Sequence, residues 1–313
     1  KKPRVVRLVF GEKPRRLRVD GEAEFAERLV RRAQRVRVEL LERLHAFIAH
    51  DVLPLVPEEG SVGARGDLTP LSYVAATLAG EREVLFNGER RSSADVHREL
   101  GWTPLVLRPK EALALMNGTA VMTGLACLAY ARADYLLKLA TRITALNVVA
   151  LQGNPEHFDE RLFAAKPHPG QMQVAAWLRQ DLAIDAPTAP LHRLQDRYSL
   201  RCAPHVLGVL ADSLNWLRGF IEIELNSAND NPIIDAEEER VLHGGHFYGG
   251  HIAFAMDSLK TLVANVADLL DRQLALLVDV RYNHGLPSNL SGASAERAML
   301  NHGFKAVQIG TSA

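Results

Sequence analysis

Apolar residues recur three and four positions apart along most of the chain after residue 22, the spacing of helices with a buried face. The pattern predicts a helix from about residue 22 to residue 53, and long helical stretches over about residues 110–151, 204–226 and 252–280. These three long stretches are apolar on more than one face, which is typical of helices inside a bundle. We therefore expect a mainly α protein whose central part is a long-helix bundle.

Alternation of apolar and polar residues is confined to two short places. Residues 1–20 alternate Val with Arg around the turn signal GEKP, which predicts a small N-terminal β-ribbon. Asn87-Gly88 lies between the runs EVLF and ERR, and Asn-Gly is a strong hairpin signal. The expected organisation is an N-terminal and glycine-loop subdomain over residues 1–109, followed by the long-helix bundle over residues 110–313.

Composition narrows the class of protein. Hydrophobic residues make up 47% of the chain, which is ordinary for a soluble globular protein. Lys plus Arg and Asp plus Glu each total 37, so nothing in the charge favours nucleic acid or a membrane surface as a partner. Cys127 and Cys202 lack CxxC spacing, which argues against a metal site and favours a reducing, cytoplasmic setting. The chain has no run of eighteen apolar residues and no recognisable signal peptide, so we expect no membrane span.

Polar segments rich in Gly, Asn, Tyr, Arg and His interrupt the helical pattern. Residues of these types on loops between rigid helices are typical of active sites. In chain order the segments are GSVGARGDLTP, MNGT, AAKPHPGQ, LQDRYSLRCAPH, NSANDNPII, HGGHFYGGH and RYNHGLPSNLSG. Each segment alone is a weak signal, and their number and order carry the information.

Taken in order, these segments resemble the aromatic amino acid ammonia-lyases and aminomutases over about residues 37–313. GSVGARGDLTPLSY resembles the loop in which that family cyclises an Ala-Ser-Gly triplet into a methylidene-imidazolone group. Here the triplet is Ala64, Arg65 and Gly66. The resemblance implies a prosthetic group made from the chain itself, with no external cofactor and no metal. It also implies a homotetramer whose active sites are shared between subunits, and an L-aromatic amino acid as substrate.

The resemblance also assigns roles to single residues. Asn117 would contact the prosthetic group and the substrate, and Arg201 would hold the substrate carboxylate, for which a planar guanidinium is well suited. Gln195 and Tyr198 would line the reacting centre, where a tyrosine can relay a proton if its pKa is lowered. Phe247 would pack against the prosthetic group or the substrate ring.

Each of these residues also has a structural interpretation. Asn117 could interrupt a helix, and Phe247 could belong to the core. Tyr198 and Arg201, three positions apart, could form a surface pair on a helix, with Gln195 in solvent. Asp230, Asn231 and Pro232 could form an Asx-type turn. His243, His246 and His251 do not have the spacing of a helical or finger-type zinc site.

Position 65 departs from the family pattern. In the cyclisation the serine loses its hydroxyl group as water and leaves the electrophilic methylene. Arg65 has no β-hydroxyl to lose, so Ala64-Arg65-Gly66 cannot make that group, and its cation would repel the substrate ammonium. In addition, no segment similar to the family's YGVNTGFG, which carries a catalytic tyrosine, occurs in residues 1–60. We expect a shortened member of the family that is inactive as written.

Two function classes stay open on these grounds. The first is an ammonia-lyase or 2,3-aminomutase scaffold, for which tyrosine or phenylalanine is favoured over histidine because Tyr248 follows Phe247. The second is a catalytically dead homologue that acts as a binding or assembly module. A fumarase-like lyase is disfavoured because the chain has no SSxMPxKxN-type loop.

Overall fold

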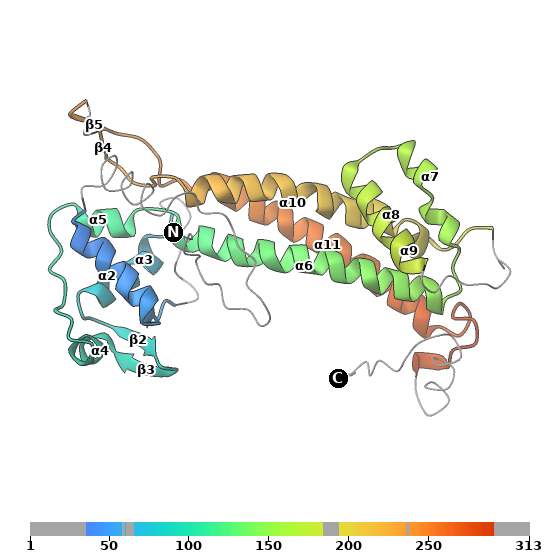
Figure 1. The fold of residues 1–313 in the computed structure, drawn as a ribbon, viewed down its shortest axis with the longest axis horizontal. Helices are drawn as coiled ribbons and strands as arrows, with labels where there is room; N and C mark the ends of the chain where they lie inside the picture. Colours follow the sequence, from blue (N-terminus) through green and yellow to red (C-terminus); the bar gives the residue numbers. More distant parts are fainter. Residues whose placement is uncertain (1–35, 58–59, 61–65, 184–193, 236–237, 291–313) are drawn as a thin grey trace. The chain divides into compact units, whose positions relative to one another are not determined.

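The structure is a computed structural model that describes residues 36–57, 60, 66–183, 194–235 and 238–290. It is mostly helical, which confirms the expected fold class. The β-ribbon predicted for residues 1–20 and the first part of the helix predicted from residue 22 lie outside the described residues. The chain divides into two compact units (Figure 1). Unit 1 comprises residues 1–128 and 219–254, and unit 2 comprises residues 129–218 and 255–313.

Unit 1 combines short helices with a small antiparallel sheet. Its helices are α2 (Val38–Ala49), α3 (Leu68–Leu78), α4 (Ser93–Glu99) and α5 (Glu111–Met116). Its three-stranded sheet has the order β1 (Leu53–Pro54), β2 (Glu83–Phe86) and β3 (Glu89–Ser92). The predicted hairpin is confirmed, because Asn87 and Gly88 join β2 to β3 with φ of 53° and 80°, the left-handed values that a type I′ turn needs.

The core of unit 1 lies between α2, α3, α4 and the sheet. Helix α2 contributes Leu40 and Phe47, which are 1% and 3% exposed. The buried partners of these two residues are Val52, Leu78, Val84, Phe86, Val96 and Leu105. Every second residue of β2 is buried, as expected for a strand with one face on a core. A second antiparallel pair, β4 (Ile233–Asp235) and β5 (Arg240–Leu242), also belongs to unit 1.

Three long helices account for most of the remaining chain. They are α6 (Ala120–Ala150), α10 (Ala203–Leu225) and α11 (Gly250–Val278). The last two confirm the predicted helical stretches 204–226 and 252–280. The prediction of one helix over residues 110–151 is wrong, because the chain forms α5, breaks at Asn117 and begins again at Ala120. Asn117 takes an extended conformation (φ −96°, ψ 97°), which ends the helix. Its side chain is therefore available to bond with another part of unit 1.

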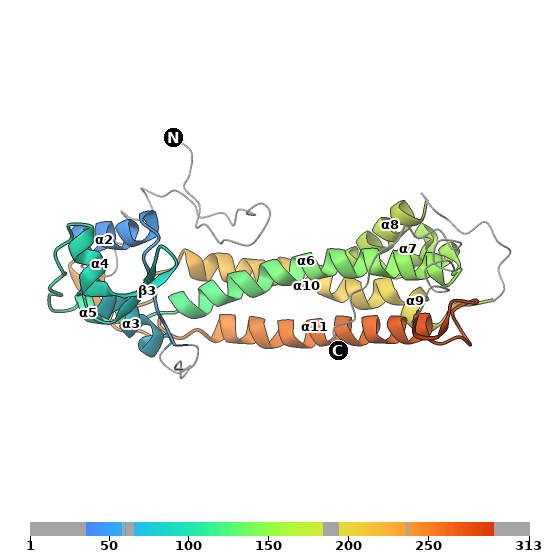
Figure 2. The ribbon, with the colours of Figure 1, turned by 90° about the horizontal axis from the view of Figure 1, so that it is seen from below.

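Unit 2 contains the greater part of α6 and α11 and the first part of α10. These helices run alongside one another in both views (Figures 1 and 2). Its shorter elements are η1 (Pro155–Phe158), α7 (Glu160–Ala164), α8 (Pro169–Leu182), α9 (Tyr198–Arg201) and η2 (Ser288–Leu290). No helix of the described chain has the length and apolar character needed to cross a membrane.

Candidate functional site

The end of the glycine-rich loop is fixed against the break between α5 and α6. Gly66 forms a parallel bridge with Gly118, and Asp67 N donates to Gly118 O at 2.8 Å. Gly66 has φ +62°, and a Cβ on it would lie 2.2 Å from Gly118 O and 2.9 Å from Phe247 O. Only glycine fits this position, because backbone atoms from two other segments occupy the space of a side chain.

Asp67 continues the same junction. Its side chain is only 1% exposed, and one carboxylate oxygen accepts from Met122 N at 2.8 Å in the first turn of α6. A carboxylate at a helix N-terminus satisfies amides that have no partner within the helix. The residue that follows the glycine loop therefore fixes that loop to the start of a long helix.

Asn117 is bound to a buried carboxylate. Its Nδ2 donates to Asp230 Oδ1 at 2.9 Å, and Asn117 and Asp230 are 7% and 0% exposed. The second oxygen of Asp230 forms an ion pair with Lys110 Nζ at 2.5 Å. Asp230 Oδ1 also accepts from Asn231 N at 2.7 Å, so the expected turn interaction coexists with the long-range contacts. The interpretation of Asn117 as a helix interruption is correct, and its amide is paired with a carboxylate.

Thr119 extends this polar cluster toward α10. Its hydroxyl donates to Glu224 Oε1 at 2.6 Å and accepts from Asn229 Nδ2 at 2.8 Å. The backbone of Phe247 lies at Gly66, and the Phe247 residue is half-buried. The segments GDL, NGT, NDNP and HFY, far apart in the sequence, therefore meet within unit 1.

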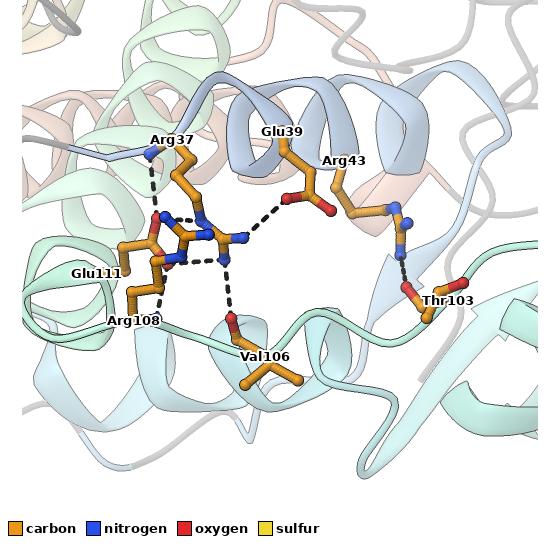
Figure 3. A network of polar contacts seen from close by, with 7 residues as sticks. All are labelled: Arg37, Glu39, Arg43, Thr103, Val106, Arg108 and Glu111. Carbon is orange, nitrogen blue, oxygen red and sulfur yellow. Dashed lines mark hydrogen bonds and ion pairs between the residues drawn. The ribbon is translucent and has the colours of Figure 1, made fainter.

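A second charged group fixes the start of α5 (Figure 3). Glu111 is 1% exposed and accepts from the backbone N and the guanidinium of Arg37, and from Arg108 N at 2.8 Å. The Arg37 guanidinium also donates to Val106 O and pairs with Glu39. Hydrogen bonds from Arg37, opposed by burial, lower the pKa of Glu111 to about 2. This carboxylate stays charged at neutral pH, and it joins the entry of α2 to α5.

Unit 2 holds Arg201, Tyr198 and Gln195. Arg201 Nε donates to Asp196 O at 3.1 Å, and its guanidinium lies 4.5 Å from the centre of the Tyr198 ring. The two terminal nitrogens of the Arg201 guanidinium lie beyond Nε, the atom that donates to Asp196 O. Tyr198 is 75% exposed and Gln195 is also exposed, as the surface-pair interpretation expects.

The turn that carries Asp196 is itself held firmly. Asp196 Oδ2 accepts from Asn154 N at 2.6 Å, and Asp196 N donates to His157 Nε2 at 3.0 Å. The second bond uses Nε2 of His157 as an acceptor. The backbone oxygen that orients Arg201 is therefore fixed by two residues of one element, η1 and its N-cap, which follows α6.

The segment KPHPGQ marks a close approach of two helices. Pro169 begins α8, Gly170 N donates to Asp212 Oδ1 of α10 at 2.7 Å, and a Cβ on Gly170 would lie 2.3 Å from Gly208 O. A Cβ added to Gly208 would in turn lie similarly close to Gln171. The geometry gives this segment a packing role between α8 and α10.

The expected site residues thus fall into two sets. Gly66, Asn117 and Phe247 belong to unit 1, and Gln195, Tyr198 and Arg201 belong to unit 2. Ala64 and Arg65 lie outside the described residues. Sequence reasoning missed Lys110 and the long-range role of Asp230. The NDNP segment was a usable signal for the role of Asp230, but an Asx-type turn explained that segment without any long-range contact.

The histidines near Phe247 do not form a recognisable metal site. Within the described ranges, no group of three or more His, Cys, Asp or Glu side chains is arranged to hold a metal ion. Both cysteines are free thiols.

Comparison with known proteins shows which family the chain is similar to. The model of the aromatic amino acid lyase family matches residues 26–313. The chain is 42% identical over 258 residues to a histidine ammonia-lyase of Geobacillus kaustophilus, covering 82% of this chain and 51% of the relative. It is 41% identical over 278 residues to a tyrosine 2,3-aminomutase of Chondromyces crocatus, covering 82% of this chain and 52% of the relative.

A solved structure shows the same likeness in three dimensions. The phenylalanine aminomutase of Pantoea agglomerans superimposes with a TM-score of 0.79 at 31% identity, covering 87% of this chain and 56% of that chain. The chain spans about half the length of the curated relatives it matches. The family match covers most of the chain, and the ordered segments meet as described above. The chain belongs to the aromatic amino acid lyase family.

Proposed function

We propose that this chain is the scaffold of an aromatic amino acid ammonia-lyase or 2,3-aminomutase that binds an L-aromatic amino acid. The observation that carries the proposal is the meeting of Gly66, Asn117, Asp230 and the Phe247 backbone in unit 1. These groups fix the end of the loop that supplies the prosthetic group in the family. The reaction class is elimination of ammonia from the amino acid, with return of the amine to the β carbon in the aminomutase case.

Arg201 supports the binding of a carboxylate. Its Nε donates to Asp196 O, so the two terminal nitrogens are the donors that can bind a carboxylate through two hydrogen bonds. The Tyr198 ring against the guanidinium limits the orientations of both side chains. We propose that Tyr198 and Gln195 line the reacting centre beside this anchor.

The exposure of Tyr198 and Gln195 supports assembly. A proton relay works best where water is excluded, and in the single chain Tyr198 is 75% exposed. We propose a homotetramer in which other copies cover these residues, and a cytoplasmic location, with which the two free thiols are consistent.

The residues present do not fit the methylidene-imidazolone group. Its electrophilic methylene comes from a β-hydroxyl, and position 65 carries a guanidinium chain without one. Gly66 does meet the steric demand of its position, where a Cβ would clash with Gly118 and Phe247. We therefore propose that the chain as written binds but does not eliminate, and we assign no chemical step to the group here.

The preferred substrate is tyrosine or phenylalanine. Tyr248 next to Phe247 supplies two aromatic rings at this end of unit 1, which favours a phenyl or phenol ring over an imidazole. Relatives named for histidine and for tyrosine match at 42% and 41% identity, so sequence identity favours neither histidine nor tyrosine as the substrate.

Intact mass and peptide mapping of residues 60–70 test this proposal. We expect the natural chain to keep its full calculated mass, and Arg65→Ser to lose two waters from that peptide as the loop cyclises. Arg65→Ala is the matched control, because it removes the cation without adding a hydroxyl, and it should keep full mass. A water deficit in the natural chain, or turnover of phenylalanine by it, would overturn the proposal.

The alternative is a catalytically dead homologue that acts as a binding or assembly module. Arg65 is the observation that favours it. Under this alternative Arg65→Ser would keep full mass, and the tetramer would form regardless. Size-exclusion chromatography with light scattering gives the second readout, and a monomer would count against both proposals.

A further inference from the structure

Asp230 connects the two ends of a short helix. Lys110 immediately precedes α5 and Asn117 immediately follows it, and each is bound by a different oxygen of the Asp230 carboxylate. Asp230 is fully buried, at 0% exposure. A carboxylate in that position is tolerated because a cation and two N–H donors satisfy it.

We infer that Asp230 is a positioning residue that sets the orientation of the Asn117 amide; this inference rests on the proposed function. An ionised carboxylate can only accept hydrogen bonds, so the NH₂ end of Asn117 must face it. The carbonyl oxygen Oδ1 is then the end of the amide that remains for a ligand. An amide oxygen accepts, so the group it suits is a donor, and the chemical class is the ammonium of an amino acid.

Lys110 keeps this orientation by holding the Asp230 carboxylate in place through their ion pair. Its backbone lies at φ +79°, a positive value that is strained for a residue with a side chain. The next residue, Glu111, is fixed by four hydrogen bonds from Arg37 and Arg108. The hydrogen bonds of Glu111 with Arg37 and Arg108, drawn in Figure 3, thus fix the backbone beside Lys110, whose side chain reaches Asp230.

A structural brace alone makes a different prediction. If the Lys110–Asp230 pair only joins two parts of unit 1, its loss lowers the stability of that unit and leaves the Asn117 amide in its usual surroundings. If Asp230 orients the amide, loss of the carboxylate changes the Asn117 side-chain signal even when the protein stays folded. The two readouts separate the two roles.

The experiment uses the full chain labelled with ¹⁵N-asparagine, with the Asn117 signal identified by its absence in Asn117→Ser. We expect Lys110→Arg, which keeps the cation, to leave this signal in place. Asp230→Asn should displace it, because the amide then loses its carboxylate partner. Lys110→Met should also displace it, because the carboxylate then loses the cation that holds it in place. Thermal unfolding is recorded in parallel. An Asn117 signal that is unchanged in folded Asp230→Asn and Lys110→Met would overturn the inference.

A ligand comparison reports the consequence for recognition. L-Phenylalanine and 3-phenylpropanoate differ in the ammonium group. Because the Arg65 cation would repel that group, the comparison uses Arg65→Ala with and without Asp230→Asn, and we expect Arg65→Ala to prefer L-phenylalanine by about tenfold or more. The double variant should lose that preference while phenylpropanoate binding is retained. A preference that survives in the double variant would also overturn the inference. Failure of both ligands to bind Arg65→Ala would contradict the proposed function, and the labelled amide would still decide the role of Asp230.

Discussion

The two units differ in the chemistry of their buried polar groups. In the described part of unit 1, three carboxylates, on Asp67, Glu111 and Asp230, are each no more than 1% exposed. In unit 2 the described polar side chains with 0% exposure are the neutral Thr144, Gln273 and Asn283. The carboxylates of unit 1 are the most deeply buried ones in the described chain. In unit 2 the most deeply buried polar groups are neutral, and the carboxylates of Asp196 and Asp212, which also fix backbone amides, are only partly buried.

This difference follows from what each region has to hold. The junction in unit 1 joins loops, where backbone geometry alone gives little rigidity, and charged hydrogen bonds are directional and strong once desolvated. Helices of unit 2 already satisfy their own backbone groups, so a few amide contacts suffice to fix their alignment. The comparison teaches that charge is concentrated where the candidate site needs a fixed loop.

The largest expected effect comes from removing the charge of Glu111. Glu111→Gln leaves the Arg37 guanidinium without its main partner, and we expect unit 1 to lose about 3 kcal/mol of unfolding free energy. Denaturant unfolding with peptide-resolved hydrogen exchange measures the loss and assigns it to a unit. Glu39→Gln is the matched control, because Glu39 touches the same guanidinium from a position 57% exposed, and its loss should stay under about 1 kcal/mol.

The pH dependence of this effect has a defined sign. The pKa of Glu111 in the folded chain is about 2, below its ordinary value of 4.5. Its contribution to stability is therefore complete above pH 4.5 and is lost as pH falls toward 2. The difference between the natural chain and Glu111→Gln should shrink over that range. A difference that stays constant from pH 7 to pH 3 would contradict the assignment of the effect to the carboxylate charge.

Packing in unit 2 gives the next effect. A methyl group in Gly170→Ala would lie 2.3 Å from Gly208 O, so α8 and α10 must separate, and we expect a loss of about 2 kcal/mol. Gly219→Ala in α10 is the control, because nothing lies within 4 Å of its added Cβ. It should be neutral or stabilising by up to about 1 kcal/mol, since alanine is the better helix former. Equal melting temperatures for the two variants would exclude a close approach at Gly170.

The neutral network of unit 2 should give a smaller loss. Gln273 Nε2 donates to Ser199 O and Thr144 Oγ1, and its Oε1 accepts from Asn147 Nδ2. In Gln273→Leu the Asn147 amide and Ser199 O lose these bonds, while Thr144 keeps its bond to Ala140 O, and the loss costs about 1 to 2 kcal/mol. Hydrogen exchange should increase in peptides of unit 2 alone. Faster exchange confined to unit 1 peptides would contradict the assignment of this neutral network to the stability of unit 2.

Local signals in the sequence were sufficient for much of the fold. The Asn87-Gly88 turn and the ends of α10 and α11 follow from turn chemistry and apolar spacing, which act over a few residues. The break at Asn117 was anticipated only as an alternative, because its Asn-Gly-Thr segment lies inside an apolar stretch that is otherwise typical of one continuous helix. Lys110 lies 120 positions from Asp230, and no local pattern links two residues at that distance. The order of the polar segments predicted the family, but the geometry of their meeting required the folded chain.

The smallest effect concerns His97, which is neutral yet titratable and therefore tests whether charge alone distinguishes unit 1. Its ring is 1% exposed and packs edge-on against Phe47 and Trp102. Burial, with a smaller effect from the Arg43 cation, lowers the pKa of His97 below its ordinary 6.5. The unfolded chain then takes up a proton before the folded chain does, so stability is complete above pH 6.5 and falls as the pH drops below it.

His97→Phe removes this titration while keeping an aromatic ring among the same neighbours. We expect the natural chain to lose stability more steeply than the variant between pH 6.5 and pH 5, measured as unfolding free energy in urea. Because the change involves a single proton, it should be smaller than the loss in Glu111→Gln. Parallel pH profiles would mean that His97 does not resist protonation, and that the carboxylates alone make unit 1 sensitive to acid.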